Sequence, residues 1–148
     1  MANTKSDFAT GKRNLPQPYD ALIAKIPVVL TLGAAPVVND TIELLELQPG
    51  VELIDYDILA PQLDSNGTPT LAASIGALNA GKTDLGAVYG DGLTFGRTAN
   101  GSISRAQDAR QTQADASVSR NIALKWTAAA ATWAGNGKKI TVLLHLKA

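Results

Sequence analysis

The sequence predicts a mainly β protein: an antiparallel β-sandwich or jelly-roll-like domain with an extended N-terminal arm. Two observations favour this fold class. Several short segments alternate apolar and polar residues, which is the period of a half-buried strand. Glycine, proline and asparagine fall between these segments, where turns are expected. We expect roughly six to eight strands, and a chain of 148 residues has the length of one domain.

The first 20 residues are predicted to form the arm. They contain few apolar side chains, and Pro16 and Pro18 disfavour regular structure. A segment of this kind lacks the apolar surface to fold alone, so we expect it to become ordered only against a partner. Residues 21–148 are then predicted to form a single β-rich domain.

Three strands are predicted in the first half of the domain. The first lies within residues 21–32, on the apolar, β-branched run 26–32, with Pro27 at its start, where a missing N–H is tolerated. Residues 41–47 and 51–58 form the next two strands. The turn Gln48-Pro49-Gly50 separates them, so these two strands are predicted to form a hairpin.

The middle of the chain is less regular. Residues 68–78 alternate and are predicted to form a half-buried strand. The apolar face of that strand contains Leu71, Ala73, Ile75 and Ala77. Residues 81–96 contain five glycines and are expected to form a long loop. Residues 97–119 are polar, and a short helix after Ser102 or Ser104 is the element expected there.

The clearest alternation is at the end of the chain. Residues 122–126 place Ile122, Leu124 and Trp126 on one face. Residues 140–146 place Ile140, Val142, Leu144 and Leu146 on one face. The tight turn Gly135-Asn136-Gly137 lies between the two runs, so they are predicted to form a hairpin.

Charge and cysteine content exclude several function classes. The 13 basic and 13 acidic residues cancel, which argues against a protein that binds nucleic acid by neutralising phosphates. The cancellation is uneven: residues 26–81 sum to −7 and residues 97–148 to +6. Such halves are expected to pair within the fold or between copies. The absence of cysteine excludes disulfides and thiol chemistry.

No targeting or membrane segment is expected either. Residues 1–20 lack the apolar stretch of a secretory signal. The longest apolar stretch, residues 26–38, is too short to span a bilayer and contains two prolines.

The sharpest motif is Gly76-Ala-Leu-Asn-Ala-Gly81-Lys82-Thr83, which matches the phosphate-loop pattern GxxxxGK[ST] at each fixed position. In a true phosphate loop Lys82 would reach the β- and γ-phosphates and Thr83 would hold Mg²⁺. The context does not fit, because glycines at 86, 90 and 92 follow in place of a helix. We interpret the match as accidental, with a nucleotide-binding enzyme kept as a hypothesis.

Other candidate sites are weaker. The loop from Gly90 to Gly96 misses the dinucleotide fingerprint, since Phe95 stands where the third glycine is needed. Asp64 and Asn66 do not begin a calcium loop, because positions 69 and 75 are Pro69 and Ile75.

Five further side chains have simpler interpretations than catalysis. Asp55 and Asp57 share a strand face and are interpreted as a solvated or salt-bridged edge. His145, the single histidine, is interpreted as a surface residue. Trp126 and Trp133 are interpreted as core or interface anchors. We therefore predict no catalytic, cofactor-binding or metal-binding residues, no cofactor and no enzymatic activity.

Three stretches carry a resemblance to a known family. NDTIELLELQPG occupies residues 39–50 and leads into residues 51–57. LDSNGTPTL occupies residues 63–71 and is followed by Ile75-Gly76. KWTAAAAT occupies residues 125–132 and precedes the run 137–146. In order and spacing, residues 38–146 resemble the head decoration proteins of tailed bacteriophages, also called cement or capsid-stabilising proteins.

The resemblance implies a structural virion protein without enzymatic activity. Such a protein would be made in the host bacterial cytoplasm and bind the exterior of the capsid. Its partners would be the major capsid protein, whose subunits it bridges, and its own copies, with a trimer favoured over a dimer. Neither nucleic acid nor a membrane is expected as a partner. Two alternatives stay open: a glycan- or surface-binding module, and another particle position such as a tail or fibre-base protein.

Overall fold

The computed structural model of the chain describes residues 2–13, 23–99, 102–105 and 117–147. Within these residues it contains nine strands and no helix, one strand more than the upper expectation. The strands are β1 (Asn3–Lys5), β2 (Ile23–Thr31), β3 (Thr41–Leu47), β4 (Glu52–Ala60), β5 (Ala72–Leu78), β6 (Leu85–Leu93), β7 (Ser102–Arg105), β8 (Arg120–Ala128) and β9 (Lys139–Lys147).

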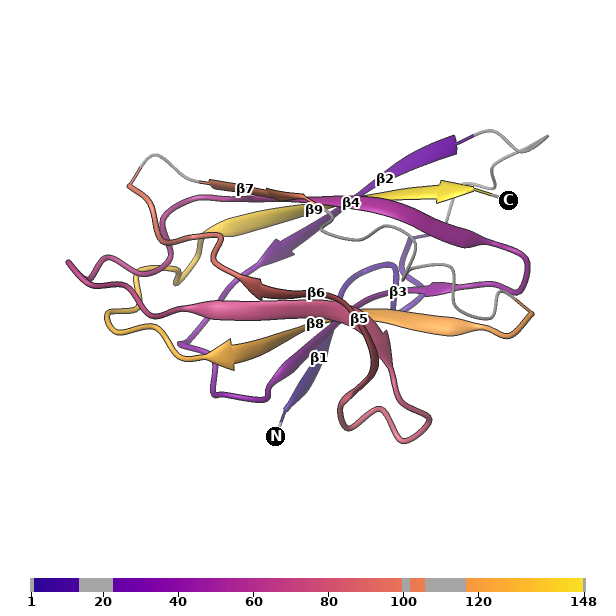
Figure 1. The fold of residues 1–148 in the computed structure, drawn as a ribbon, viewed down its shortest axis with the longest axis horizontal. Helices are drawn as coiled ribbons and strands as arrows, with labels where there is room; N and C mark the ends of the chain where they lie inside the picture. The colour runs from indigo at the N-terminus through magenta and orange to yellow at the C-terminus, as the bar shows by residue number, and fades with distance from the viewer. Residues whose placement is uncertain (1, 14–22, 100–101, 106–116, 148) are drawn as a thin grey trace.

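The strands form two layers, which confirms the predicted β-sandwich (Figure 1). Sheet A has five strands in the order β1-β3-β8-β5-β6, and sheet B has four in the order β2-β9-β4-β7. Neighbouring strands run antiparallel, except that β1 runs parallel to β3.

The core lies between the two sheets and is built from the alternating apolar residues. The predicted inner face of β9 is confirmed, because its four aliphatic side chains are at most 1% exposed. The predicted face of β8 is confirmed as well, with Trp126 at 2% exposure. Leu71, Ala73, Ile75 and Ala77 are all buried. Ser74 is buried too, so the strand predicted to be half-buried is covered on both faces there.

Both predicted hairpins are wrong in their pairing, although their strands are present. The turn at Gln48–Gly50 carries the chain from β3 in sheet A to β4 in sheet B. The segment between β8 and β9 also crosses from sheet A to sheet B. As a result β3 pairs with β8, and β4 pairs with β9. Each connection therefore passes from one sheet to the other, and the two strands that it joins cover the core from opposite sides.

The predicted loop over residues 81–96 is a strand for most of its length, namely β6. Gly90 in β6 and Gly76 in the paired strand β5 mark close approaches of neighbouring atoms. A Cβ atom on Gly90 would lie 1.9 Å from the Tyr56 hydroxyl. A Cβ atom on Gly76, the β5 neighbour of Val88, would lie 1.9 Å from the Ala87 carbonyl oxygen. Register shifts between β5 and β6 accompany these contacts.

The helix expected after Ser102 or Ser104 is not present at residues 102–105, which form β7 beside β4. The edge of β4 offers main-chain hydrogen-bonding groups, which a strand can use and a helix cannot. Residues 106–116, the rest of that prediction, lie outside the described residues.

The beginning of the predicted arm packs against the chain's own domain. β1 extends sheet A beside β3, and the Ser6 N–H donates to the Glu43 carbonyl oxygen at 2.8 Å. Ser6 is buried, and its hydroxyl donates to the Leu44 carbonyl oxygen. Main-chain pairing with an otherwise open edge makes up for the low apolar content of this segment. Residues 14–22, which include the predicted boundary at residue 20, lie outside the described residues.

Candidate functional site

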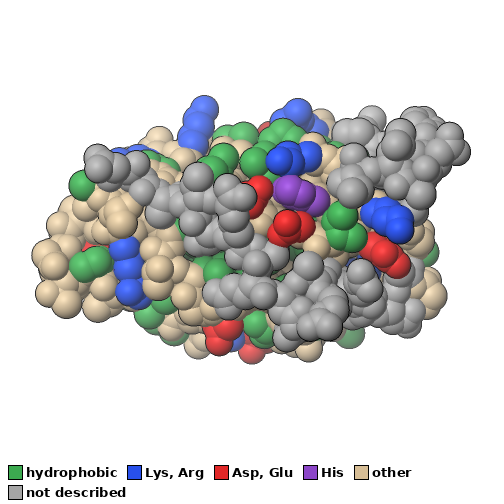
Figure 2. Space-filling view, turned by 45° about the horizontal axis from the view of Figure 1, so that its top comes forward, with side chains coloured by type: hydrophobic (Ala, Val, Ile, Leu, Met, Phe, Trp, Pro, Cys, Tyr) green, Lys and Arg blue, Asp and Glu red, His purple; other side chains and the backbone are tan. Residues whose placement is uncertain are grey.

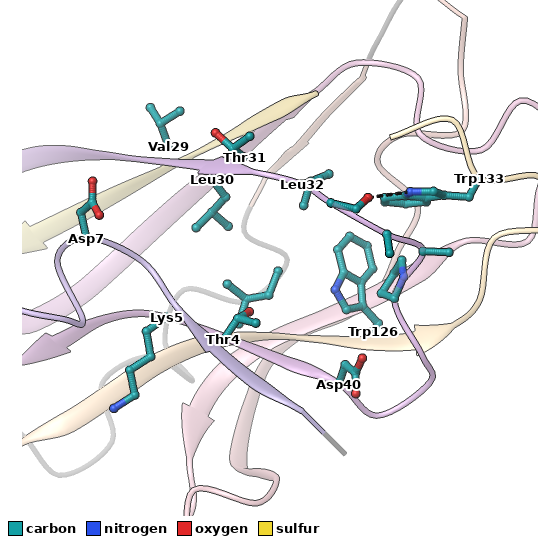
Figure 3. Close-up of a pocket in the computed structure, with 15 residues that line it drawn as sticks. Thr4, Lys5, Asp7, Val29, Leu30, Thr31, Leu32, Asp40, Trp126 and Trp133 are labelled. Carbon is teal, nitrogen blue, oxygen red and sulfur yellow. Dashed lines mark hydrogen bonds between the residues drawn. The ribbon is translucent and has the colours of Figure 1, made fainter. Parts of the chain in front are cut away.

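A groove of about 540 Å³ opens along one side of the sandwich, where β1 and β2 form the edges of the two sheets (Figure 3). Thr4 and Lys5 line it from sheet A, and Leu30 and Leu32 line it from sheet B. Leu30 points into the groove, whereas Val29 and Thr31 point away from it. The groove therefore combines an apolar wall with two exposed strand edges.

Two tryptophans lie at one end of the groove. Trp126 belongs to the core, with 2% exposure, and its ring lies 5.9 Å from that of Phe95. Trp133 meets Trp126 edge-on at 6.4 Å, and its indole N–H donates to the Gly33 carbonyl oxygen at 3.0 Å. Trp126 is thus a core anchor, as expected, and is too buried to offer a ring face to a sugar.

A tight turn over residues 37–40 borders the groove. Asn39 has a positive φ of 75°, and the Asp40 N–H donates to the Val37 carbonyl oxygen at 3.0 Å. The Asp40 carboxylate accepts from the N–H groups of Ala2 at 2.9 Å and Val37 at 3.1 Å. These bonds, that from Ala2 first, lower the pKa of Asp40. The turn is well tied, and its Val37 side chain is 66% exposed.

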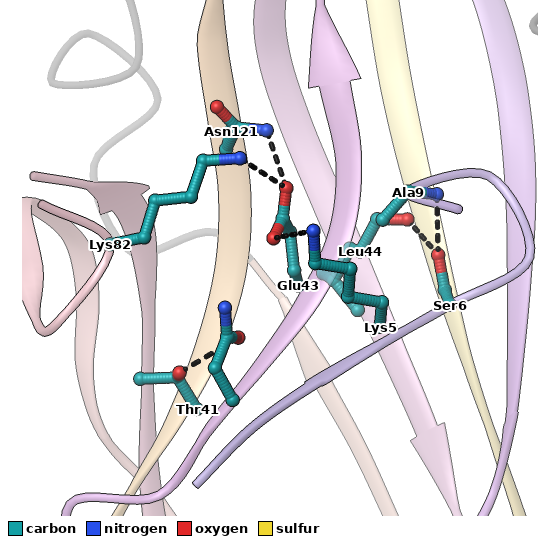
Figure 4. Close-up of polar contacts among 9 residues, drawn as sticks. Lys5, Ser6, Ala9, Thr41, Glu43, Leu44, Lys82 and Asn121 are labelled. Carbon is teal, nitrogen blue, oxygen red and sulfur yellow. Dashed lines mark hydrogen bonds and ion pairs between the residues drawn. The ribbon is translucent and has the colours of Figure 1, made fainter. Parts of the chain in front are cut away.

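A buried carboxylate joins four parts of sheet A (Figure 4). The Glu43 side chain is 1% exposed. Its oxygens accept from the Asn121 amide at 2.5 Å and lie 3.4 Å from Lys82 Nζ and 3.7 Å from Lys5 Nζ. Two positive charges and an amide thus offset the cost of burying this charge.

Asp64 is a second buried carboxylate, with no exposed surface. Its two oxygens accept five backbone N–H bonds, at 2.9–3.2 Å. The donors are Asn66, Thr70, Leu71, Ala131 and Thr132. Burial by itself raises the pKa of Asp64, but the bonds from Thr132, Ala131, Thr70 and Asn66 outweigh it and hold that pKa well below its usual range. Asp64 therefore ties two loops together and is not arranged as a calcium ligand.

The segment that matches the phosphate-loop pattern has a different geometry. Gly76 lies within β5, and Lys82 has a positive φ of 54° in the turn that leads to β6. Asn79 Oδ1 accepts from the Thr83 N–H at 3.0 Å, and Asn79 donates to the Thr83 hydroxyl at 3.1 Å. A strand follows this turn, so the segment has no helix N-terminus to face a phosphate.

The acidic pair and the histidine lie together on the outer face of sheet B. His145 Nε2 lies 3.2 Å from Asp57 Oδ2, and Asp55 is the β4 residue opposite His145 in the strand register. Figure 2 shows the histidine beside acidic side chains. The edge predicted for Asp55 and Asp57 to be solvated or salt-bridged thus includes a contact between Asp57 and the histidine that was expected to be a simple surface residue. His145 is in fact partly buried.

Across the described residues, no three His, Cys, Asp or Glu side chains are grouped so as to hold a metal ion. In the same part of the chain no helix is long and apolar enough to cross a membrane.

Sequence reasoning missed the groove, because it depends on which strands end at the sheet edges. It also missed the Glu43 cluster. The alternation carried no signal for this cluster, because Glu43 pairs with Ala123, on the face of β8 opposite to Ile122 and Leu124.

Two solved structures resemble this chain over almost its full length. The first is a chain of the capsid of Ralstonia phage GP4, with a TM-score of 0.81 and 28% identity over 99% of this chain and 97% of that chain. The second belongs to the capsid asymmetric unit of cyanophage Pam1, with a TM-score of 0.67 and 17% identity over 93% of this chain and 94% of that chain. No protein-family model matches the sequence, and no curated protein matches it significantly.

The two likenesses carry different weight. At 17% identity the Pam1 chain supports the fold. The GP4 chain adds sequence similarity along the whole domain. The GP4 match supports a phage capsid-related protein with a structural role in the virion.

Proposed function

We propose that this chain is a decoration protein that binds the exterior of a phage capsid lattice and stabilises it by bridging major capsid subunits. The observation that carries the proposal is the match to a chain of the Ralstonia phage GP4 capsid over 99% of the sequence. The motifs over residues 39–71 and 125–146 that resemble head decoration proteins lie within that matched length.

The physical gain of such a protein is multivalency. A decoration protein that touches several capsid subunits adds weak contacts at high effective concentration, so it can hold a lattice together without a large single interface. A trimer, which we favour over a dimer, would multiply these contacts around a symmetry axis. The opposite charges of residues 26–81 and 97–148 suit contacts between protein surfaces.

Part of this charge is paired within the chain. Lys125 Nζ lies 2.7 Å from Asp84 Oδ1, and Lys82 and Lys5 face Glu43. The proposed contact with the lattice therefore involves the charged side chains that remain on the surface, among them Glu46 and Lys139, which are exposed.

Binding to assembled heads tests this proposal. Purified chain is mixed with heads of the encoding phage that lack it, and bound chain is measured by cosedimentation. The proposal expects saturable binding to expanded heads and a mass in solution above the 15.4 kDa of one copy, with three copies favoured over two. Binding to isolated tails or to glycans in place of heads would favour one of the alternatives and overturn the proposal.

The glycan-binding alternative is supported less well. It needs an exposed aromatic face in a groove, and Trp126 is 2% exposed while the indole N–H of Trp133 is bonded to Gly33. An unchanged tryptophan fluorescence across a panel of glycans is the result we expect.

A further inference from the structure

We propose that the open edge of β2 at Val29 and Thr31 receives an extended segment of a capsid subunit as an added strand, whose inward side chains enter the groove beside β1. This inference rests on the proposed function and names the surface that carries it out. It begins with the direction of the main-chain groups in β2.

The hydrogen bonds of Leu32 fix that direction. Its N–H donates to the Lys138 carbonyl oxygen at 2.8 Å, and its own carbonyl oxygen accepts from the Gly137 N–H at 2.8 Å. Both main-chain groups of Leu32 therefore face the side of β9. Main-chain direction alternates along a strand of an antiparallel pair, so the groups of Leu30 and Val28 face β9 as well. Those of Val29 and Thr31 face the other side.

Among the described residues β2 pairs only with β9, so the side of β2 that faces away from β9 is an open edge. Pro27 fits this assignment, since proline lacks an N–H and is tolerated in a strand where that position faces outward. Beyond Pro27 the edge offers the N–H and carbonyl groups of Val29 and Thr31. The Val29 side chain is also 48% exposed.

The groove lies directly beside this edge. An added strand would lie about 4.8 Å from β2 and would alternate its side chains between the two faces of sheet B. Those on the inner face would enter the groove, where Leu30, Ile42 and Trp126 form apolar lining. The occupant is therefore an extended segment with apolar residues at alternate positions.

The edge itself favours a polypeptide segment over a small molecule. A row of main-chain donors and acceptors at strand spacing is what another strand pairs with, and the flanking pocket gives the side-chain specificity. A second copy of β2 fits less well. Both copies would bring Pro27 and the exposed Lys25 to the joint, and edge proline and lysine oppose such edge-to-edge pairing.

Val29→Pro tests the inference, because it removes one outward N–H and keeps an extended backbone. Val29→Ala is the matched control, since it shortens the side chain and keeps the N–H. Val28→Pro is the fold control, because the Val28 N–H faces β9. We expect Val29→Pro to melt within a few degrees of the wild type and Val28→Pro to melt much lower.

Cosedimentation with heads of the encoding phage is the readout. We expect Val29→Pro to weaken binding at least about tenfold, the effect of about 1.4 kcal/mol, and Val29→Ala to weaken it less. If Val29→Pro folds and binds heads like the wild type, the inference is wrong and the proposed function stands. If the wild type itself does not bind heads, both are wrong. If Val29→Pro instead abolishes self-association measured by light scattering and leaves head binding unchanged, a second copy is the occupant and the inference is overturned.

Discussion

The Lys82 ammonium lies 3.4 Å from Oε1 of Glu43, a carboxylate whose side chain is 1% exposed. In a phosphate loop the lysine at this place of the motif would face a phosphate. Here it faces a buried carboxylate on β3, which is separated from β5 by β8 in sheet A. Lys82 thus has a structural role, pairing with Glu43, in a segment that matches the phosphate-loop pattern in sequence and not in structure.

Lys82→Ala is expected to lower the free energy of unfolding modestly. The Lys82 side chain is 44% exposed, so solvent screens its attraction to Glu43, and Lys5 and Asn121 stay in place. We expect a loss of about 0.5–1.5 kcal/mol by urea denaturation. Exposed Lys12 supplies a matched control, Lys12→Ala, which should be neutral. Titration of Mg-ATP should give equally negligible heat for wild type and Lys82→Ala; a heat that only the wild type shows would revive the nucleotide site.

Asp64→Asn is expected to destabilise the domain strongly. The asparagine side chain has the shape of the aspartate side chain but no charge. One of the two oxygens that accept the five N–H bonds becomes an NH₂ group, which donates and cannot accept. We expect a loss of at least about 3 kcal/mol by urea denaturation. Exposed Asn66→Ala, which removes fewer bonds, should cost less. Equal costs for the two variants would contradict the role given to Asp64.

The pH dependence of stability follows from the same carboxylate. Its pKa is lower in the folded than in the unfolded state, where it is about 3.9. The folded state therefore gains stability above pH about 4 and loses it progressively as the pH falls below that value. Urea denaturation between pH 6 and pH 2 should show this loss in the wild type. Asp64→Asn should show a smaller slope, with the remainder due to Asp40, Asp84 and Asp91, whose pKa values are also lowered.

The sequence predicts single strands of this fold well and their pairing poorly. Alternation in ITVLLHL fixes which residues face the core, so β9 lies where it was predicted. β3 also lies where it was predicted, although a register shift between Glu43 and Leu45 interrupts its alternation. Alternation does not say which sheet a strand joins. A short turn such as Gln48–Gly50 can reverse the chain within a sheet or carry it across to the other sheet, and here it crosses.

Gly90→Ala tests the reinterpretation of the glycine-rich segment as a strand. The new Cβ atom would collide with the Tyr56 hydroxyl, so we expect a loss of about 1–3 kcal/mol in the free energy of unfolding. Gly67→Ala is the control, because no atom lies within 4 Å of its added Cβ. In a Tyr56→Phe background the cost of Gly90→Ala should fall. An unchanged cost in that background would mean that another contact is responsible.

Ser6→Ala tests whether the beginning of the predicted arm belongs to the domain. The buried Ser6 hydroxyl donates to the Leu44 carbonyl oxygen, so the variant should lose about 1–2 kcal/mol of stability in the isolated protein. Thr10→Ala, which removes an exposed hydroxyl bond to Asp7, should be neutral. If Ser6→Ala leaves the stability unchanged, residues 2–13 do not contribute to the stability of the domain through this bond, and the prediction of a free arm stands.

The groove could not be predicted from the sequence for a related reason. Val29, Leu30 and Thr31 read as an ordinary strand, and nothing in their pattern indicates that one side of β2 stays open. Pro27 was the available signal, because proline in a strand indicates an edge. The opposite wall depends on β1, a segment with too little apolar content to predict a strand.

The stability of heads measures the central claim most directly. Heads of the encoding phage that lack the chain are heated with and without purified chain, and DNA release is followed by dye fluorescence. A decoration protein that bridges capsid subunits should bind these heads and raise the release temperature, with a saturating dependence on its concentration. Heads that neither bind the chain nor change their release temperature would contradict the account.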